Sequence, residues 1–399
     1  MTTTTSAPTT SATASGGDLV AGAKALQPLV REHAAAGDDA GELSAPVVDA
    51  LHEHGLFGMW VPAPLGGTEL DPLSSLLVIQ TLAEADPSTS WVVMAAALAT
   101  GTGGAYLSDE AVAEMFGGPR FPVVAGQGTR PGSAVIDGDG YRLSGSWSFA
   151  SGIKHAQWIH TLGIIEDTGQ PKIFVLPVEK AQLIDNWDVL GLRATGSIDY
   201  VIENVYVPEG FTHFGPAEKA ERGGNLFNLG IMHFAMICHS GWALGVTRRM
   251  LDELAALVQS KAGRPGTLAD SSAFHTLFGE AEAKWHAARA FIYDTWRGVS
   301  DTIAGGDALS HEQRTMTRLA LYHATWAAEE ISVAVYRAAG TTALRSGVLQ
   351  QYFRDMHAGT QHVTSAPGAI ENCGRDLAGL APEHEWLYMN LVPTAPDAG

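Results

Sequence analysis

The chain has 399 residues, 46% of them hydrophobic, which is enough to bury a large core and to build more than one domain. Its 24 basic and 43 acidic residues give a formal net charge of -19, which disfavours nucleic acid and anionic membranes as partners and leaves a small-molecule substrate. The two cysteines, Cys238 and Cys373, make no disulfide framework and have no zinc-binding spacing, so we expect a reducing, cytoplasmic compartment.

Residues 1–17 are rich in Thr, Ser and Ala and carry neither a basic region nor an apolar one. They are therefore not a signal peptide, and we predict a disordered tail. We find no apolar run long enough to span a bilayer. From residue 18 to 121 apolar residues recur at helical spacing, and Asp71-Pro72 is a typical helix start, an N-cap followed by proline. This segment is predicted to be an N-terminal helical domain.

Residues 122–225 change to the short β-rich runs typical of strands. The sequence Asp137-Gly138-Asp139-Gly140 stands between two such runs and predicts a hairpin. We therefore expect a small central β domain.

The chain from 226 to 399 is predicted to be a bundle of long helices. The predicted helices cover residues 231–259, 272–304, 310–339 and 348–364. Ser310 and Gln313 have the spacing of a capping box at the start of the third helix. Helices, then strands, then helices argue for an α+β fold, mainly α, rather than for alternating βαβ units.

Several well-known catalytic patterns are absent from the sequence. No Gly-x-Gly-x-x-Gly pattern follows a strand, and there is no P-loop, His-Glu-x-x-His or Gly-x-Ser-x-Gly pattern. A nicotinamide site and a metal hydrolase are therefore disfavoured, and no metal site is expected.

The first motif that points to chemistry is Gly-Ser-Trp-Ser-Phe-Ala-Ser-Gly at residues 145–152. An aromatic ring such as Phe149 can cover a flat ligand ring while a hydroxyl such as that of Ser151 hydrogen-bonds one of its nitrogens. The alternative is an ordinary turn at a strand end with a core phenylalanine.

Two further motifs follow. Gly-Leu-Arg-Ala-Thr-Gly-Ser at residues 191–197 is a glycine-flanked basic loop, which can serve a ligand or simply connect two elements. In the last predicted helix, Arg354 and His357 share one stripe, and Asp355 and His362 share the next. Taken alone, these histidines fit an ordinary core or surface role as well.

Together, in this order, the three motifs resemble the acyl-CoA dehydrogenase superfamily. Within it they are similar to the group D two-component flavin-dependent monooxygenases, the group of the p-hydroxyphenylacetate hydroxylase oxygenase component. The elements Trp-x-Phe-x-Ser-Gly, Gly-Leu-Arg-x-Thr-Gly-Ser and Arg-Asp-x-His-x-x-x-x-His carry the resemblance, which extends over residues 18–393. It implies an N-terminal helical domain (18–121), a central small β-barrel domain (122–225) and a C-terminal four-helix bundle (226–399).

The resemblance also implies a flavin site. In the family, the hydroxyl at the position of Ser151 hydrogen-bonds flavin N5, and the aromatic residue at the position of Phe149 lies against the flavin. Gln127 and Gly128 match the upstream loop that covers the pyrimidine side of the flavin.

Other matching positions imply contacts between subunits. Arg264 stands where the family has a basic residue near the flavin phosphate of a neighbouring subunit, although Arg264 before Pro265 also fits a plain loop arginine. Gly340 and Thr341 match a glycine-rich turn that also crosses to another subunit. A homotetramer is therefore implied.

The base that the dehydrogenases need is missing at its usual place. Nine residues after Arg354 stands Val363, which cannot take a proton, and beside it is His362, which can act as a general base near neutral pH. Because the oxygenases have a histidine here, the resemblance favours oxygenation over dehydrogenation. Three glutamates on the bundle helices remain as alternative dehydrogenase bases, namely Glu282, Glu329 and Glu330.

The mechanism implied by the resemblance begins with a separate reductase that supplies reduced FAD or FMN. O2 adds to the flavin to give a C4a-hydroperoxyflavin. Ser151 and a water-excluding pocket slow the loss of peroxide from this species. His362 then activates the substrate for transfer of one oxygen atom.

The helix around residues 95–100 is small and apolar, where phenol hydroxylases of the family have a histidine. We therefore expect a bulky aromatic or natural-product-like substrate beside Ala96 and Ala99, with His357 as a further contact. Whether carbon, nitrogen or sulfur is oxidised stays open, as does the choice of FMN or FAD.

Two other interpretations remain at this point. One is an acyl-CoA dehydrogenase or oxidase with tightly bound FAD. The other is a non-catalytic flavin or hydrophobic-ligand binding protein that has kept the fold.

Overall fold

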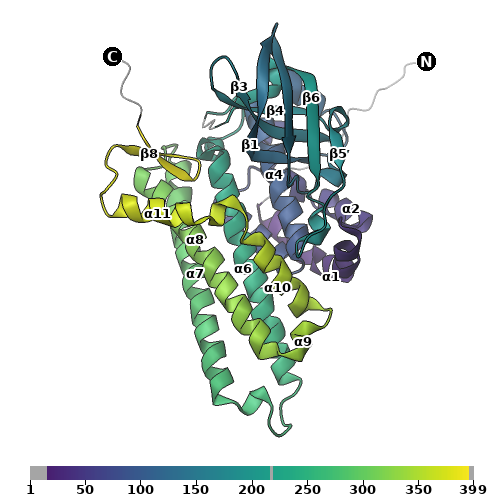
Figure 1. Cartoon of the computed structure of the whole chain (residues 1–399), viewed down its shortest axis with the longest axis vertical. Coiled ribbons are helices and arrows are strands. Elements are labelled where there is room, and N and C mark those ends of the chain that lie inside the picture. The colour runs from purple at the N-terminus through teal and green to yellow at the C-terminus, as the bar shows by residue number, and fades with distance from the viewer. Residues whose placement is uncertain (1–15, 216–218, 395–399) are drawn as a thin grey trace, which may run out of the picture.

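The structure is a computed structural model that describes residues 16–215 and 219–394. N-terminal helices, a β-sheet and a set of long helices follow one another along the chain, which confirms the expected architecture (Figure 1). Of the predicted tail, residues 1–15 lie outside the described part, whereas Gly16 and Gly17 already belong to the first helix.

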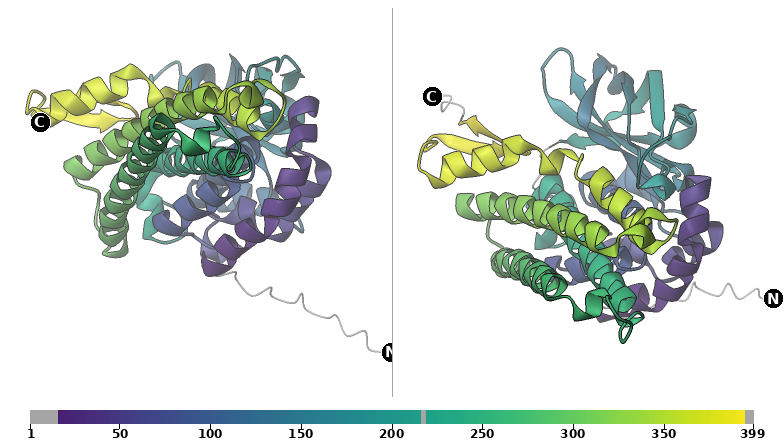
Figure 2. Two further views of the ribbon diagram at one scale, coloured as in Figure 1. Left: turned by 90° about the horizontal axis from the view of Figure 1, so that it is seen from below. Right: turned by 60° about the horizontal axis from the view of Figure 1, so that its bottom comes forward.

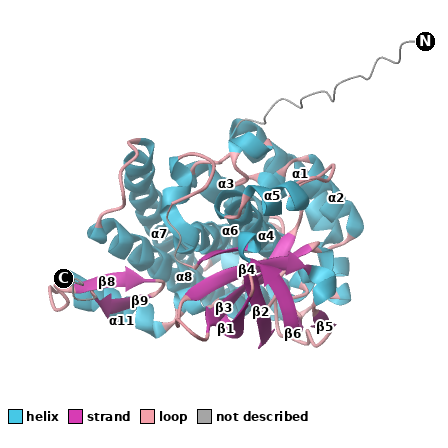
Figure 3. Cartoon of the chain, turned by 90° about the horizontal axis from the view of Figure 1, so that it is seen from above, coloured by secondary structure: helices cyan, strands magenta, loops and turns pink. Residues whose placement is uncertain are grey.

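The N-terminal helices are α1 (Gly16–Ala40), α2 (Ala45–Glu53), α3 (Pro72–Ala83), α4 (Pro87–Tyr106) and α5 (Asp109–Met115). Helix α3 begins as predicted, because Asp71 accepts the backbone N–H groups of Leu73 and Ser74 at 3.0 Å. Helix α4 is buried almost all round, since it packs against α6 on one side and β1 on the other. Figure 3 shows α4 close against the sheet.

The strands of residues 124–214 form one seven-stranded sheet in the order β5-β6-β2-β1-β3-β4-β7. They are β1 (Val124–Asp137), β2 (Gly140–Trp147), β3 (Trp158–Ile165), β4 (Pro171–Pro177), β5 (Gln182–Ile184), β6 (Asp199–Pro208) and β7 (Thr212–Phe214). The predicted hairpin joins β1 and β2. Strands β5 and β7 each pair on one side only among the described residues, so the pairing is that of an open sheet rather than the closed barrel that we expected.

The C-terminal helices are α6 (Gly230–Gln259), α7 (Ser272–Ala304), α8 (His311–Ala339), α9 (Thr341–Leu344), α10 (Val348–Gly359) and α11 (Pro367–Leu377). Helix α8 has the predicted capping box of Ser310 and Gln313. Helix α11 and the hairpin of β8 (His384–Leu387) and β9 (Asn390–Pro393) were not anticipated.

Helix α10 ends at Gly359, earlier than the predicted 364. The hydroxyl of Thr360 donates to the carbonyl of His357 at 2.7 Å, and His362 N–H bonds to the Gly359 carbonyl, so the chain leaves the helical path. His362 therefore stands outside the helix on which we had placed it.

The segment Asn225–Gln259 is long and apolar enough to cross a membrane, contrary to our reading of the sequence. Its apolar window is 89% buried inside the protein, because α6 lies between the N-terminal helices and α7 and α8 (Figure 2). It is the central core helix of this fold.

Candidate active site

The motif at residues 145–152 ends β2 and forms a tight turn. Phe149 has a positive φ of 67°, which is unusual for a bulky residue, and Ser151 N–H donates to the Phe149 carbonyl at 3.0 Å. The turn leaves the Phe149 side chain 65% exposed, while Ser151 is buried beneath. Backbone strain of this kind persists where the surroundings enforce it, often at ligand sites.

The loop at residues 191–197 joins this turn directly. Gly152 N–H donates to the Thr195 carbonyl at 2.8 Å, and the hydroxyls of Ser151 and Ser197 lie 2.8 Å apart. The loop is therefore part of the same site as Ser151 rather than a simple connection.

Arg354 and Asp355, the Arg-Asp pair of the third motif, hydrogen-bond to the start of this loop from α10. Asp355 is fully buried and accepts the backbone N–H of Leu192 at 2.6 Å. Arg354 donates to the Leu190 carbonyl and to the Asp38 carboxylate, both at 2.8 Å. Burial, together with the nearby Asp86, raises the pKa of Asp355 well above its usual range. The pair therefore holds the fold of the site.

The contact between Gly191 and α10 leaves no room for a side chain. A Cβ at this position would lie 2.3 Å from the carbonyl oxygen of Arg354 and 2.7 Å from the backbone nitrogen of Asp355. We expect Gly191→Ala to lower the free energy of unfolding by about 1–3 kcal/mol, because backbone atoms must separate. Urea unfolding checks this, with Gly298→Ala as the control, since a Cβ there meets nothing within 4 Å. Equal stability of both variants would contradict the prediction.

His362 lies in an aromatic setting. Its ring stacks on that of His239 from α6, with centroids 4.0 Å apart, and lies edge-on to Trp91 from α4 at 5.8 Å. Its Nδ1 pairs with the Thr364 hydroxyl at 2.9 Å. Burial lowers the pKa of His362 to about 4, so the ring is neutral at pH 7 and can accept a proton. Burial, and secondly His362, also lowers the pKa of His239.

Trp91 connects the two predicted catalytic residues. Its indole Nε1–H donates to Ser151 Oγ at 3.1 Å, while its ring packs edge-on against His362, His239 and Trp242. Ser151 and His362 are thus brought to one place. Trp91 and His239 are site residues that the sequence alone does not mark, because each resembles an ordinary core residue until its neighbours are known. Ser197 belongs to the predicted loop motif, but its contact with Ser151 appears only in the structure.

Helix α4 keeps only one narrow stripe partly exposed beside Trp91. In this buried helix Ala95 and Leu98 keep partial exposure and share a stripe with Trp91, whereas Ala96 is fully enclosed by the core and Ala99 nearly so. The contacts of Ala96 and Ala99 with substrate stay predictions. The stripe of Trp91, Ala95 and Leu98 is the better candidate surface.

His357 faces α8 rather than Trp91. Its Nε2 lies 3.4 Å from the Ser332 hydroxyl, its Nδ1 lies 3.7 Å from the Glu329 carboxylate, and its ring packs on Phe353. Its assignment to the substrate remains an untested prediction.

Gln127 and Gly128 lie in β1, where the pairing with β3 shifts its register. Gln127 accepts the backbone N–H of Arg130 at 2.8 Å, and a Cβ at Gly128 would meet nothing within 4 Å. Open space at Gly128 suits a ligand, and the flavin contact stays a prediction.

Arg264 and the pair Gly340–Thr341 lie in two turns at the lower end of the bundle, between α6 and α7 and between α8 and α9 (Figure 1). The sheet lies toward the opposite end of the long axis (Figure 1), and Ser151 stands between the sheet and Trp91 of α4. One chain alone therefore does not bring these residues to Ser151, and their role across a subunit boundary stays a prediction.

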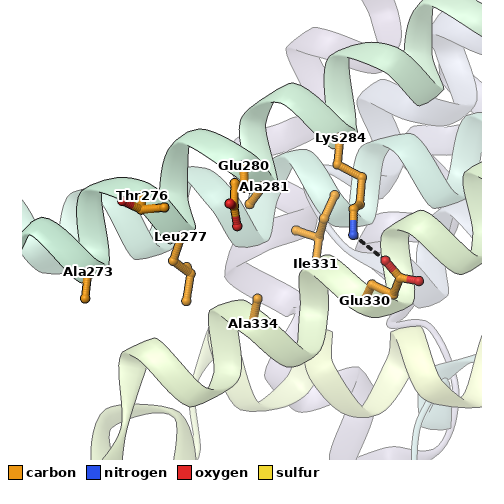
Figure 4. Close-up of a pocket in the computed structure, with 9 residues that line it drawn as sticks. All are labelled: Ala273, Thr276, Leu277, Glu280, Ala281, Lys284, Glu330, Ile331 and Ala334. Carbon is orange, nitrogen blue, oxygen red and sulfur yellow. Dashed lines mark hydrogen bonds and ion pairs between the residues drawn. The ribbon is translucent and has the colours of Figure 1, made fainter.

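A groove of about 490 Å³ runs between α7 and α8 (Figure 4). Apolar residues such as Leu277 and Ile331 line it, and an ion pair of Lys284 and Glu330 closes one end. Every lining residue comes from these two helices, so the groove is separate from the site around Ser151.

Models of the acyl-CoA dehydrogenase N-terminal and C-terminal domains match residues 23–114 and 237–367. Indole-3-acetate monooxygenase of Pseudomonas putida is 30% identical over 90% of this chain and 94% of its own length. The flavin-dependent monooxygenase oxygenase subunit HsaA of Rhodococcus jostii is 28% identical over 86% of this chain and 93% of its own.

The chain belongs to the acyl-CoA dehydrogenase family. The names of its relatives place it among the flavin-dependent monooxygenases of that family, as the motifs predicted. Solved structures agree on the fold. XiaF from Streptomyces sp., in complex with FADH2 and glycerol, has a TM-score of 0.84 at 22% identity and covers 96% of this chain and 97% of its own. HsaA from M. tuberculosis has a TM-score of 0.83 at 24% identity, over 92% and 98%.

The carboxylates that a dehydrogenase would need are engaged elsewhere in this flavin-dependent monooxygenase. Glu282 makes a two-pronged ion pair with Arg248 at 2.8 and 2.9 Å, and Glu330 pairs with Lys284. Glu329 lies beside His357. Within the described residues none of the three contacts Trp91 or His362, so the structure offers no support for a displaced glutamate base.

The residues of the site also fit a flavin. Phe149 offers an exposed aromatic side chain two residues before Ser151. Leu190, which precedes the loop at residues 191–197, and Val363, which follows His362, are exposed apolar side chains. A flat aromatic ligand with polar ring atoms needs such a combination of apolar faces and one well-placed hydroxyl.

Proposed function

We propose that this chain is the oxygenase component of a two-component system, which transfers one oxygen atom from O2 to an aromatic substrate. The observation that carries the proposal is the position of Trp91, which holds Ser151 by a hydrogen bond and His362 by a ring contact. A hydroxyl that can bind flavin and a neutral base then share one site, in which no carboxylate of the described residues contacts Trp91 or His362.

Ser151, Phe149, Gln127 and Gly128 would hold the flavin ring. Reduced FAD or FMN, when bound, supplies the activation of O2. His362 would accept the proton of the substrate hydroxyl or ring nitrogen, for which its neutral state is required. The buried rings around it exclude water from the reacting atoms.

We propose an aromatic substrate that is larger than a simple phenol. The stripe of Trp91, Ala95 and Leu98 offers apolar contact, and His239 and His362 offer uncharged nitrogen atoms for one polar group of the ring. The names of the relatives, which include indole-3-acetate monooxygenase and a resorcinol hydroxylase, agree with a ring substrate.

The partner would be a flavin reductase. Relatives are named oxygenase subunit or oxygenase component, which implies a second protein that supplies the reduced flavin. We further propose a cytoplasmic homotetramer, in which Arg264, Gly340 and Thr341 of one subunit reach the flavin of another. Light scattering and a count of flavins bound per chain test that assembly.

The decisive experiment mixes the protein anaerobically with reduced FMN or FAD and then adds an oxygen pulse, followed by stopped-flow absorbance. We expect a long-lived absorbing species that differs from oxidised flavin and decays at least about tenfold more slowly than in free flavin, because the buried rings beside Ser151 and His362 would keep water from the reacting atoms. Indole, indole-3-acetate and resorcinol are then tested for hydroxylated products by mass spectrometry.

Reoxidation as fast as that of free flavin would contradict the proposal. In that case acyl-CoA thioesters with an artificial electron acceptor distinguish a dehydrogenase, which would also retain FAD through purification.

A further inference from the structure

The Ser151 hydroxyl belongs to a line of hydrogen bonds whose two ends have fixed directions. At one end, Trp91 Nε1 can only donate, and it lies 3.1 Å from Ser151 Oγ. At the other end, the Leu192 carbonyl can only accept, and it lies 2.7 Å from Thr195 Oγ1. Between them Ser151 and Ser197 are 2.8 Å apart, and Ser197 and Thr195 are 2.6 Å apart.

Each hydroxyl has one proton, so these ends determine every donor in the line. Thr195 gives its proton to the Leu192 carbonyl, and it must therefore accept from Ser197. Ser197 has then used its own proton and must accept from Ser151. The Ser151 proton is thus turned inward, and its lone pairs point to Trp91 and to the remaining open side.

The line is buried, so water does not readily reorient it. Ser197 and Thr195 are almost fully enclosed, and Ser151 keeps only 8% of its surface. The Leu192 carbonyl is itself held, because the backbone N–H of Thr195 at 3.1 Å and the indole N–H of Trp187 at 3.3 Å also donate to it. Inside a protein, where the dielectric constant is low, an enforced hydrogen-bond direction has more effect than in water.

We infer that Ser197 and Thr195 are positioning residues that keep Ser151 a hydrogen-bond acceptor, so that the site selects reduced flavin over oxidised flavin. N5 of reduced flavin carries a hydrogen and donates, whereas N5 of oxidised flavin has only a lone pair and would face the lone pair of Ser151. The inference rests on the proposed function, because it needs a flavin beside Ser151. It supplies a physical reason for the chain to take flavin in the reduced state and release it oxidised.

The test measures dissociation constants rather than turnover. Reduced flavin is titrated anaerobically and oxidised flavin aerobically, both by fluorescence, and the ratio of the two constants is compared between variants. Ser197→Ala removes the acceptor of the Ser151 proton, which can then turn toward N5 of oxidised flavin. We expect the preference for reduced flavin to fall about fivefold or more, the effect of one hydrogen bond gained or lost.

Thr195→Val breaks the line one step further away and should shift the ratio in the same direction. Ser197→Thr keeps a hydroxyl and should retain the wild-type ratio. Thr325→Val is the matched control, because Thr325 is a buried threonine of α8 that bonds only its own helix in the structure. Circular dichroism establishes that each variant is folded.

Two failures are distinguishable. If the wild-type chain binds no reduced flavin, the proposed function fails and the inference fails with it. If the wild-type chain binds reduced flavin but Ser197→Ala and Thr195→Val leave the ratio within twofold of that of Thr325→Val, the proposed function stands and the inference is overturned.

Discussion

Replacing His362 with alanine is expected to lower the rate of substrate oxygenation about 10²- to 10⁴-fold, the usual contribution of a general base. Flavin binding should stay within about threefold of the wild type, because Ser151 and Phe149 are unchanged, and loss of one distant packing contact changes binding by well under a kcal/mol. Oxygen uptake would continue and release hydrogen peroxide in place of product. Product analysis beside an oxygen electrode measures both quantities.

The pH dependence of the wild-type rate sharpens this expectation. A base works in its neutral form, and burial lowers the pKa of His362 to about 4. The rate should therefore stay level from pH 8 down to about 5 and fall below that. A loss of rate with its midpoint near pH 6.5, the usual pKa of histidine, would contradict the lowered pKa of His362.

The matched control is His323→Ala, a histidine on the exposed face of α8. This substitution should leave unchanged both the rate of oxygenation and the fraction of the consumed oxygen that appears in product. If His362→Ala behaves like His323→Ala while flavin still binds, the base assignment is wrong, and a non-catalytic binding protein becomes the better interpretation.

Acidification is expected to destabilise the folded chain strongly. Burial lowers the pKa of His160 and His233 to about 3 and that of His213 to about 4, and it lowers that of His239 as well. In the unfolded chain these histidines bind protons below pH 6.5, whereas in the folded chain they stay neutral. Each therefore removes about 1.4 kcal/mol of unfolding free energy for every pH unit between 6.5 and about 4.

Two aspartates act in the opposite direction. Burial raises the pKa of Asp86 to about 6 and raises that of Asp355, so the folded chain takes up these protons before the unfolded chain does. Acid stabilises the fold through these two groups, and the four histidines together with His362, whose pKa is lowered to about 4, outweigh them. We expect a net loss of about 1–3 kcal/mol between pH 6.5 and 5.5, measured by urea unfolding at each pH.

A single substitution tests the origin of this effect. His160→Phe should reduce the slope of the unfolding free energy against pH by about 1.4 kcal/mol per pH unit, which corresponds to one proton. The reason is that His160 is buried and its Nδ1 has no hydrogen-bond partner among the described residues. His286→Gln changes an exposed histidine and should leave the slope alone. An unchanged slope in His160→Phe would show that the buried histidines do not cause the acid sensitivity.

Local sequence signals were sufficient for the elements that form by themselves. The N-cap of Asp71 and the capping box of Ser310 act within one helical turn, and the β1–β2 hairpin is fixed by its own turn residues. The three motifs also sufficed to predict the family. They contain Ser151 and His362, the two residues to which the resemblance assigns the binding hydroxyl and the base.

Only the tertiary structure decided which residues surround those two. Trp91, His239 and Ser197 come from three segments far apart in the chain, and no local spacing relates an indole on α4 to a ring on α6. The packing at the end of α10 is also tertiary, because Trp242 of α6 leaves no room for a side chain at Gly359. Helix propensity and spacing act over a few residues, whereas the burial that makes His362 neutral and the line of hydroxyls that orients Ser151 arise only when the sheet closes against the helices.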